Sequence, residues 1–486
     1  MERRASRDRR AVLQALCASA ALGGCRFLGQ TSLDSPPRWL DTGAPRPPVI
    51  FVHGAFGARL RHTATGKEIW PIGVPELLVG SFGDLQLPLD PATAEAASDD
   101  VVADALFEEA GVVEFYGSLV SMLESAGGYR LQQAGTRPAT DEPPLYAFLY
   151  DWRRDLVEAA GRLDVLVEQI RVDHGNPDLQ VDIVSHSSGG LVTRYFLLYG
   201  GAPLAADGVL RPAFAGAAKA RRVVAVGVPE LGMARAVTAL TDGEPVVMSK
   251  VGPEVLATSH TAFQLLPHGD DVWLIDIDGN PIDGDPCDPD LWRAMEMGIF
   301  NRRVRSRVRE HAGGGRAGRA WLALVERGFA VRLARAQRFR EALRAAPVPE
   351  TVPYFSIGGE CRPTRARLVI EEFLGHRETQ SLPAQVRAPR AGVDYWSLML
   401  EPGDGQVTRH SALGRPAWPS AGAKPVETAR RAPWQRFVCA SHNQLFVNQD
   451  CQRAMLHALA DTLDDAGTTP AGASASGSLR EAAAGR

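Results

Sequence analysis

Short apolar runs alternate with longer amphipathic segments along much of this chain. Two segments, at about 155–173 and 189–199, repeat apolar residues with the period of a helix. A continuous apolar run of the kind that forms a buried parallel strand occurs at 49–52, and further short, mostly apolar strands are expected at 146–149, 181–184, 222–226 and 354–357. Strands that alternate with helices predict an α/β fold with a mostly parallel, doubly wound sheet.

The alternation stops between residues 233 and 347, where helical patterns such as 292–309 follow one another and a single hairpin is expected at 272–282. We interpret this stretch as a largely helical cap, or lid, inserted into a core formed by 47–232 and 348–464. From residue 465 to 486 the chain is rich in Ala, Gly, Ser and Thr, which predicts a disordered tail.

The N-terminus has the features of an export signal. Five of the first ten residues are Arg, and a short apolar stretch follows. The end of this 1–25 segment resembles a lipobox, with Cys25 as the lipidated residue; a plain cleaved signal peptide is the alternative. Residues 26–46 are rich in Pro, Ser, Asp and Gly and predict a flexible tether. We therefore expect an exported protein of the cell envelope, either periplasmic or a membrane-anchored lipoprotein.

The cysteines fit that location. Apart from Cys17 and Cys25, four remain, and four cysteines in an exported protein suggest disulfides. Their pairing stays open: Cys439 and Cys451 flank a short segment and are one plausible pair, whereas buried free thiols are the alternative. The other two are Cys287 and Cys361.

Charge and ligand patterns exclude several function classes. The net charge of −4 gives no basic field for nucleic acid, and the Arg-rich stretch 302–309 is interpreted as a solvated helix face. No Cys or His spacing is typical of a zinc site. The acidic turn near Asp276 departs from an EF-hand, since Pro281 stands where that loop needs Gly. We expect neither a metal nor a cofactor.

The candidate nucleophile is Ser187. It lies in the segment 185–189, between a predicted strand and a predicted helix, as a nucleophile elbow requires. Ser185 replaces the more usual Gly and is still small. The backbone N–H of Ser188 is one expected oxyanion donor, and that of Ala55, in the loop after the first strand, is the other. His53 in that loop is interpreted as structural.

An acid and a base should follow Ser187 in this order. Asp404 lies between two glycines in the segment 402–407, as a carboxylate held on a tight loop would. His442 precedes an apolar segment and a helix, and is the expected base. His410 competes for that role, but it lies only six residues after Asp404, which leaves no room for the usual intervening strand.

These blocks together resemble the lecithin:cholesterol acyltransferase family. The likeness rests on residues 48–57, 150–153, 184–190 and 403–407, with further similarity at 227–232 and 264–267. The resemblance implies an α/β-hydrolase fold with a lid over an apolar cleft. It also implies a lipid acyl ester as donor, whose acyl group passes to Ser187 and then to an alcohol or to water. His53, Ser185 and Ser188 depart from the family pattern, and leave the substrate and the acyl acceptor open.

The leading functional hypothesis is a serine-dependent O-acyltransferase or a phospholipase-type acyl hydrolase. A carboxylesterase or lipase that acts on other esters is the second, and a non-catalytic lipid-binding lipoprotein is the third. The complete Ser, Asp and His set argues against the third. Phe56 and Trp152 are weaker candidates for the wall of the acyl site. Expected partners are a lipid or other acyl-ester substrate and, through Cys25, a membrane surface, but no nucleic acid.

Overall fold

The computed structural model describes residues 46–71, 82–110, 113–138, 142–204, 211–246, 249–268, 270–419 and 434–460. The predicted signal peptide with Cys25, the tether up to residue 45 and the tail from residue 465 lie outside these ranges. Within them, no helix combines the length and apolarity needed to span a bilayer.

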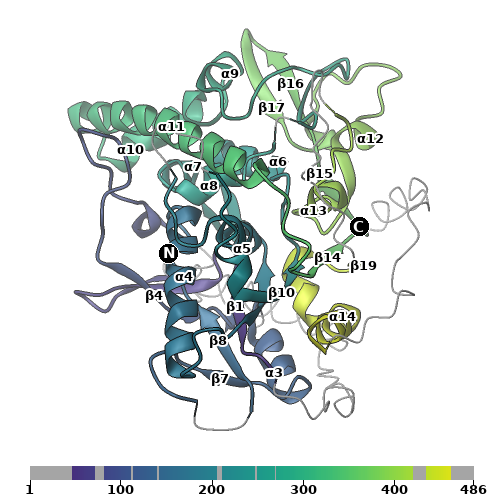
Figure 1. Ribbon diagram of the computed structural model, residues 1–486. Coiled ribbons are helices and arrows are strands. Elements are labelled where there is room, and N and C mark those ends of the chain that lie inside the picture. Colours follow the sequence, from purple (N-terminus) through teal and green to yellow (C-terminus); the bar gives the residue numbers. More distant parts are fainter. Residues whose placement is uncertain are drawn as a thin grey trace, which may run out of the picture.

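A parallel sheet of seven described strands forms the centre of the molecule (Figure 1). Its spatial order is β19-β14-β10-β9-β1-β8-β7, and every neighbouring pair is parallel. The strands are β1 (Val49–Val52), β7 (Arg130–Gln132), β8 (Pro144–Phe148), β9 (Val181–His186), β10 (Ala220–Val226), β14 (Tyr354–Gly359) and β19 (Trp434–Val438). The five predicted strands are confirmed, and β7 and β19 add an edge strand on either side.

Helices cover both faces of this sheet, as the doubly wound prediction requires. On β1, Ile50 and Val52 belong to one buried cluster, whereas Val49 and Phe51 belong to the other. Successive side chains of a strand point to opposite faces, so every residue of β1 is buried. The first face packs against α4 (Leu156–Asp173) and α5 (Ser188–Tyr199), and the second against α3 (Gly117–Ser125) and α14 (Gln449–Ala460).

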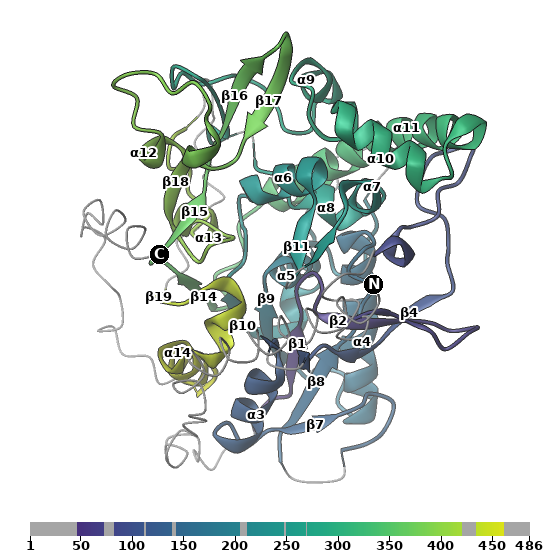
Figure 2. The same cartoon turned by 180° about the vertical axis from the view of Figure 1, so that it is seen from behind.

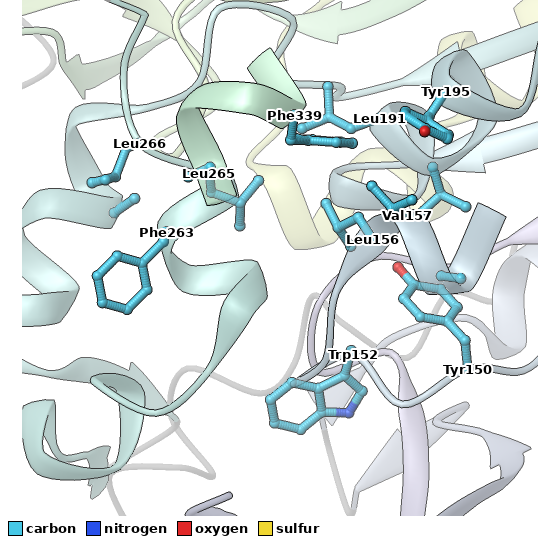
Figure 3. Packing of buried hydrophobic residues seen from close by; sticks show 14 of the residues in the cluster. Tyr150, Trp152, Leu156, Val157, Leu191, Tyr195, Phe263, Leu265, Leu266 and Phe339 are labelled. Carbon is cyan, nitrogen blue, oxygen red and sulfur yellow. The ribbon is translucent and has the colours of Figure 1, made fainter. Parts of the chain in front are cut away.

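The predicted insertion forms a layer beyond the carboxyl ends of the strands (Figures 1 and 2). Its elements are α6 (Ala234–Asp242), β11 (Glu244–Val246), β12 (Ser249–Val251), α7 (Pro253–Leu256), α8 (His260–Gln264), β13 (Leu274–Asp276), α9 (Pro289–Ala294), α10 (Arg302–His311) and α11 (Gly315–Arg344). Figure 3 shows Phe263 and Leu265 from this layer packed with Phe339 of α11 toward Leu156 and Leu191 of the core helices. The cap and the core therefore share one apolar cluster.

Residues between β14 and β19 also join the cap layer. The strand β13 of the insertion pairs in parallel with β16 (Leu368–Phe373), which pairs with β17 (His376–Gln380). Nearby, β15 (Arg362–Arg365) pairs with β18 (Leu400–Gly403), and α12 (Tyr395–Met399) contacts β18. A cap that ends at residue 347 therefore stays a proposal, because strands on both sides of that boundary build one small sheet.

The disulfide joins Cys361 to Cys439, so the suggested Cys439–Cys451 pair is wrong. The reason is the register of the sheet. Strands β14 and β19 are parallel neighbours with Gly359 opposite Val438, and the two cysteines follow those positions. Cys451 instead points into the core from α14, and it and Cys287 are buried free thiols. Burial raises the pKa of the Cys287 thiol to about 12.

Candidate active site

Ser187 occupies a sharp turn between β9 and α5. Its backbone has φ +52° and ψ −129°, a conformation that non-glycine residues adopt at a cost. The two glycines after it permit the turn. A Cβ on Gly189 would lie 2.4 Å from the carbonyl oxygen of His53, and one on Gly190 would lie 2.1 Å from a methyl group of Val228. The crowding that defines a nucleophile elbow is therefore present.

Asp404 and His442 are in direct contact. Nδ1 of His442 lies 2.7 Å from Oδ2 of Asp404, and both side chains are buried. The other carboxylate oxygen, Oδ1, accepts hydrogen bonds from the backbone N–H groups of Gln406 (2.9 Å) and Val407 (2.7 Å). The N–H of His442 also donates to the carbonyl oxygen of Asp404, at 2.9 Å. The carboxylate and the imidazole thus have one defined mutual orientation.

Ser187 and His442 line the same cavity, whose volume is about 320 Å³. Gly227 leaves room for the imidazole, because a Cβ there would lie 3.1 Å from Cε1 of His442. Gly227 also has φ +58°, which glycine adopts without strain. The structure therefore brings Ser187, His442 and, through His442, Asp404 together at one cavity. His410, the competing base, is half-exposed, contacts Glu401 at 3.2 Å, and does not line that cavity.

The loop after β1 passes directly over Ser187. A Cβ on Gly54 would lie 2.7 Å from Cβ of Ser187, so only glycine fits this approach. The next residue, Ala55, lines the cavity. Ser188 is the first residue of α5, and its N–H has no acceptor within the helix. The helix N-terminus adds positive potential on that side. The two amides predicted as oxyanion donors thus flank the serine.

Tyr116 connects that loop to the nucleophile strand, a role that the sequence analysis missed. Its buried hydroxyl accepts the Gly54 N–H at 3.0 Å and lies 2.8 Å from Nδ1 of His186. The ring of His186 packs 4.7 Å from that of His442. Burial, followed by the charge of His442, lowers the pKa of His186 well below its usual value. A neutral imidazole therefore lies beside the imidazole of His442.

His53 supports the loop from the side away from the cavity. Its Nδ1 lies 2.7 Å from the carbonyl oxygen of Gly54, and its ring stacks on Tyr150 at a centroid distance of 4.2 Å. Burial lowers the pKa of His53 to about 4, with a smaller opposing contribution from the Gly54 carbonyl. The residue does not line the cavity, and its contacts fit the structural role expected from the sequence.

Aromatic and aliphatic side chains make up most of the cavity wall. Phe56 and Trp152, the weaker sequence candidates, both line it, with ring centroids 4.2 Å apart. Phe56 has φ +62°, and its carbonyl oxygen accepts the indole N–H of Trp70 at 2.9 Å. The cap supplies an apolar side of the wall, formed by Met233, Ala236, Ala239, Leu256, Ala262 and Leu265.

One charged pair interrupts this apolar wall and was not predicted. Arg235 of α6 and Glu244 of β11 both line the cavity, with Nη2 of Arg235 2.6 Å from Oε1 of Glu244. Nε of Arg235 lies 2.9 Å from the same carboxylate oxygen. This two-point contact joins an element of the helical cap to the strand that follows it. No local pattern in the sequence indicates that these two residues face the cavity.

In the ranges that the structure describes, no three His, Cys, Asp or Glu side chains are grouped in a way that could hold a metal ion. In the acidic turn after β13, a carboxylate accepts hydrogen bonds from the backbone of the turn itself. Asp276 accepts the backbone N–H groups of Asp278 (2.9 Å) and Asn280 (2.8 Å), and Ile282 bonds back to Leu274. The predicted hairpin turn is confirmed.

Comparison with known proteins agrees with this geometry. Residues 128–293 match the family model of lecithin:cholesterol acyltransferase. The matched residues include Ser187 with its elbow and most of the cap elements up to α9, so the predicted resemblance is confirmed. A search of curated proteins found no match.

Three solved structures resemble this chain to different degrees. A chain in the crystal structure of the Tle4–Tli4 complex has a TM-score of 0.50 at 14% identity, over 86% of this chain and 98% of that one. A gene product of Listeria innocua (TM-score 0.33, 11% identity, 86% and 96% covered) and lipase 1 from Pelosinus fermentans (0.32, 12%, 87% and 99%) also match. The first likeness and the parallel sheet with its flanking helices establish the predicted α/β-hydrolase fold.

Proposed function

We propose that the protein is a lipid-ester acyl hydrolase or acyltransferase that works through an acyl-enzyme on Ser187. The observation that carries the proposal is the contact between His442 and Asp404 beside Ser187, at the wall of one mostly apolar cavity. The family match over residues 128–293 supports the same reaction class.

The protonation states follow from the contacts. With the proton on Nδ1, His442 donates a hydrogen bond to the Asp404 carboxylate, and Nε2 carries the lone pair of the neutral imidazole. In the proposed reaction, Nε2 accepts the proton of the Ser187 hydroxyl while the oxygen attacks the ester carbonyl. Asp404 stabilises the imidazolium that forms. The amides of Ala55 and Ser188 donate to the negative oxygen of the tetrahedral intermediate.

Collapse of that intermediate breaks the ester bond, and His442 returns the proton to the departing alkoxide. The acyl group then remains on Ser187. A second hydroxyl compound enters, loses its proton to His442 and attacks the acyl-enzyme. The bond between the acyl group and Ser187 then breaks, and His442 passes the proton to the departing Ser187 oxygen. Water gives a fatty acid, whereas an alcohol gives a new ester. Both outcomes use the same residues, so the acceptor decides between hydrolase and acyltransferase.

The cavity wall supports an acyl chain as the bound group. Phe56 and Trp152 on the core side, and Leu256 and Leu265 on the cap side, offer apolar surface near Ser187. Burial of a methylene group contributes about 0.8 kcal/mol, so a medium or long chain would bind more tightly than acetate. A carboxylesterase or lipase that acts on other esters remains the second proposal. Export, and membrane attachment through a lipidated Cys25, are further proposals.

Labelling with a fluorophosphonate probe tests the nucleophile. We expect the wild-type protein to be labelled, Ser187→Ala to remain unlabelled, and Ser356→Ala, a buried serine on β14 of the same sheet, to be labelled normally. A folded wild-type protein that resists the probe would contradict the proposal. Product analysis with phosphatidylcholine, with and without a long-chain alcohol, then distinguishes free fatty acid from a new ester. Activity on short soluble esters alone would favour the second proposal.

A further inference from the structure

The hairpin formed by β16 and β17 projects at the end of the molecule where the cap lies, beyond α6 (Figures 1 and 2). Phe373 pairs with His376, so the loop between the strands has only two residues, Leu374 and Gly375. The side chains at this tip do not fold back onto the protein. Leu374 is 82% exposed and Phe373 is 43% exposed. The hairpin thus presents two large apolar side chains to the surroundings.

The backbone of this turn is unusual for the residue that it carries. Leu374 has φ +52° and Gly375 has φ +74°. A two-residue hairpin loop with positive φ at both positions is a type I′ turn, in which Asn-Gly is strongly preferred. Glycine meets this requirement at the second position, but leucine at the first is strained. The chain therefore keeps an exposed leucine at the tip where asparagine would be more stable and more soluble.

Cationic side chains surround the base of the tip. The guanidinium of Arg387 lies over the ring of Phe373 at 4.4 Å, and Arg302 donates to Nε2 of His376 at 2.6 Å. Arg302 and Arg303, both exposed, begin α10. The segment 302–344, which holds α10 and α11, has thirteen arginines and three glutamates, whereas the whole chain has a net charge of −4. Several of these arginines are buried or paired with carboxylates, so the positive charge nearest the tip comes from the exposed pair Arg302 and Arg303. Arg387 is paired with Glu378.

We propose that the tip of the β16–β17 hairpin inserts into an anionic lipid surface, with Arg302 and Arg303 at the start of α10 facing the headgroups. An exposed apolar tip beside cationic side chains suits the boundary between headgroups and acyl chains, because each part finds its preferred surroundings there. The choice of lipid as the occupant rests on the proposed lipid-ester activity. Insertion of Leu374 also gives a physical reason for a strained leucine at this turn.

Sedimentation with lipid vesicles tests the proposal. The full-length chain is used with Cys25→Ser in every sample, so that a lipid anchor cannot contribute. One set of vesicles contains phosphatidylcholine alone, and the other contains equal parts of phosphatidylcholine and phosphatidylglycerol. We expect binding to the anionic vesicles and weaker binding to the neutral ones. Leu374→Asn should reduce the partition coefficient on anionic vesicles about tenfold, the order of effect that burial of a leucine has.

Leu374→Asn should weaken vesicle binding without destabilising the fold, so the two measurements distinguish loss of membrane docking from loss of structure. Leu374→Asn should leave the melting temperature unchanged or raise it, because asparagine suits the turn. Leu374→Gly tests the same point without a side chain. Val172→Asn removes a side chain of similar exposure from α4 and should bind vesicles as the parent does. The proposal would be overturned if the parent protein bound neither kind of vesicle. It would also be overturned if Leu374→Asn bound the anionic vesicles as tightly as the parent does.

Turnover of a water-soluble short-chain ester reports the proposed function separately. We expect Leu374→Asn to hydrolyse that ester at the parental rate while losing activity on anionic vesicles. If neither the soluble ester nor phosphatidylcholine is hydrolysed by any form, the proposed function fails, but the vesicle-binding result still decides the docking surface.

Discussion

The backbone N–H of Gly54 donates a hydrogen bond to the hydroxyl of Tyr116, 3.0 Å away. The same hydroxyl contacts Nδ1 of His186, the residue before the proposed nucleophile. One buried tyrosine thus joins the loop that carries Ala55 to the strand that carries Ser187.

Removal of this hydroxyl should therefore impair turnover more than binding. We expect Tyr116→Phe to lower kcat about tenfold to a hundredfold with little change in KM, because a buried N–H and a ring nitrogen lose their partner beside the oxyanion site. Steady-state kinetics on a soluble ester measures both parameters. Tyr129→Phe, a buried tyrosine that does not line the cavity, is the matched control and should be nearly silent. Equal kinetics for the two variants would argue against a role for Tyr116.

Replacement of Asp404 by Asn should be far more damaging. An amide in place of the carboxylate cannot stabilise the imidazolium, and it favours the wrong tautomer of His442. We expect kcat to fall about 10⁴-fold with the fold intact. His410→Gln serves as the control, since His410 is half-exposed and contacts Glu401 away from the cavity. If His410→Gln lost activity while Asp404→Asn stayed active, His410 rather than His442 would be the base, and Asp404 would not be the acid.

Gly54 should tolerate no side chain. A methyl group there would lie 2.7 Å from Cβ of Ser187, so the loop with Ala55 must move away. A displacement of about 1 Å in a catalytic group costs on the order of a hundredfold in rate, and we expect at least that for Gly54→Ala. Gly161→Ala, in α4, places its new methyl group at an ordinary contact distance of 3.7 Å from the carbonyl oxygen of Gly201 and should stabilise the protein by up to about 1 kcal/mol. Chemical unfolding and kinetics of both variants check this contrast.

Stability should fall in mild acid. Burial holds the pKa of His53 at about 4, whereas the unfolded chain titrates near the usual 6.5. The unfolded state therefore binds more protons between these values. The contribution of a neutral buried His53 is complete above pH 6.5 and is lost as the pH falls toward 4, by about 3 kcal/mol. His53→Gln should flatten this part of the stability profile, as measured by urea unfolding between pH 4 and 7.5. An unchanged profile would mean that His53 is protonated without cost.

The sequence predicted those parts of the fold in which local pattern and burial coincide. All residues of β1 and β9 are buried; β1 stands out as an uninterrupted apolar run, and β9 as a mostly apolar one that leads into the Ser187 motif. The edge strand β7 has only three residues, two of them exposed, so no apolar run marks it. The Cys361–Cys439 pair depends on the register of β14 and β19, which spacing along the chain does not contain.

The candidate site divides in the same way. Ser187 lies in a short motif, and the glycines that follow it in the sequence mark the crowded turn. The contact of Asp404 with His442 was expected from chain order in this fold, and the structure shows the two side chains in contact. Tyr116 and His186 lie 70 residues apart, and Arg235 meets Glu244 only because α6 turns into β11. Contacts of this kind arise from tertiary packing, so periodicity gives no signal for them.

The disulfide between Cys361 and Cys439 makes the bracing of the His442 segment depend on the redox state of the compartment. Cys439 lies three residues before His442, and the bond ties this segment to the end of the neighbouring strand β14. In a reducing compartment the two cysteines remain free thiols, and the His442 segment is held by non-covalent contacts alone. An oxidising compartment adds the covalent tie. On the proposal that the chain is exported, the covalent tie to the His442 segment would form only after the chain leaves the reducing place of synthesis.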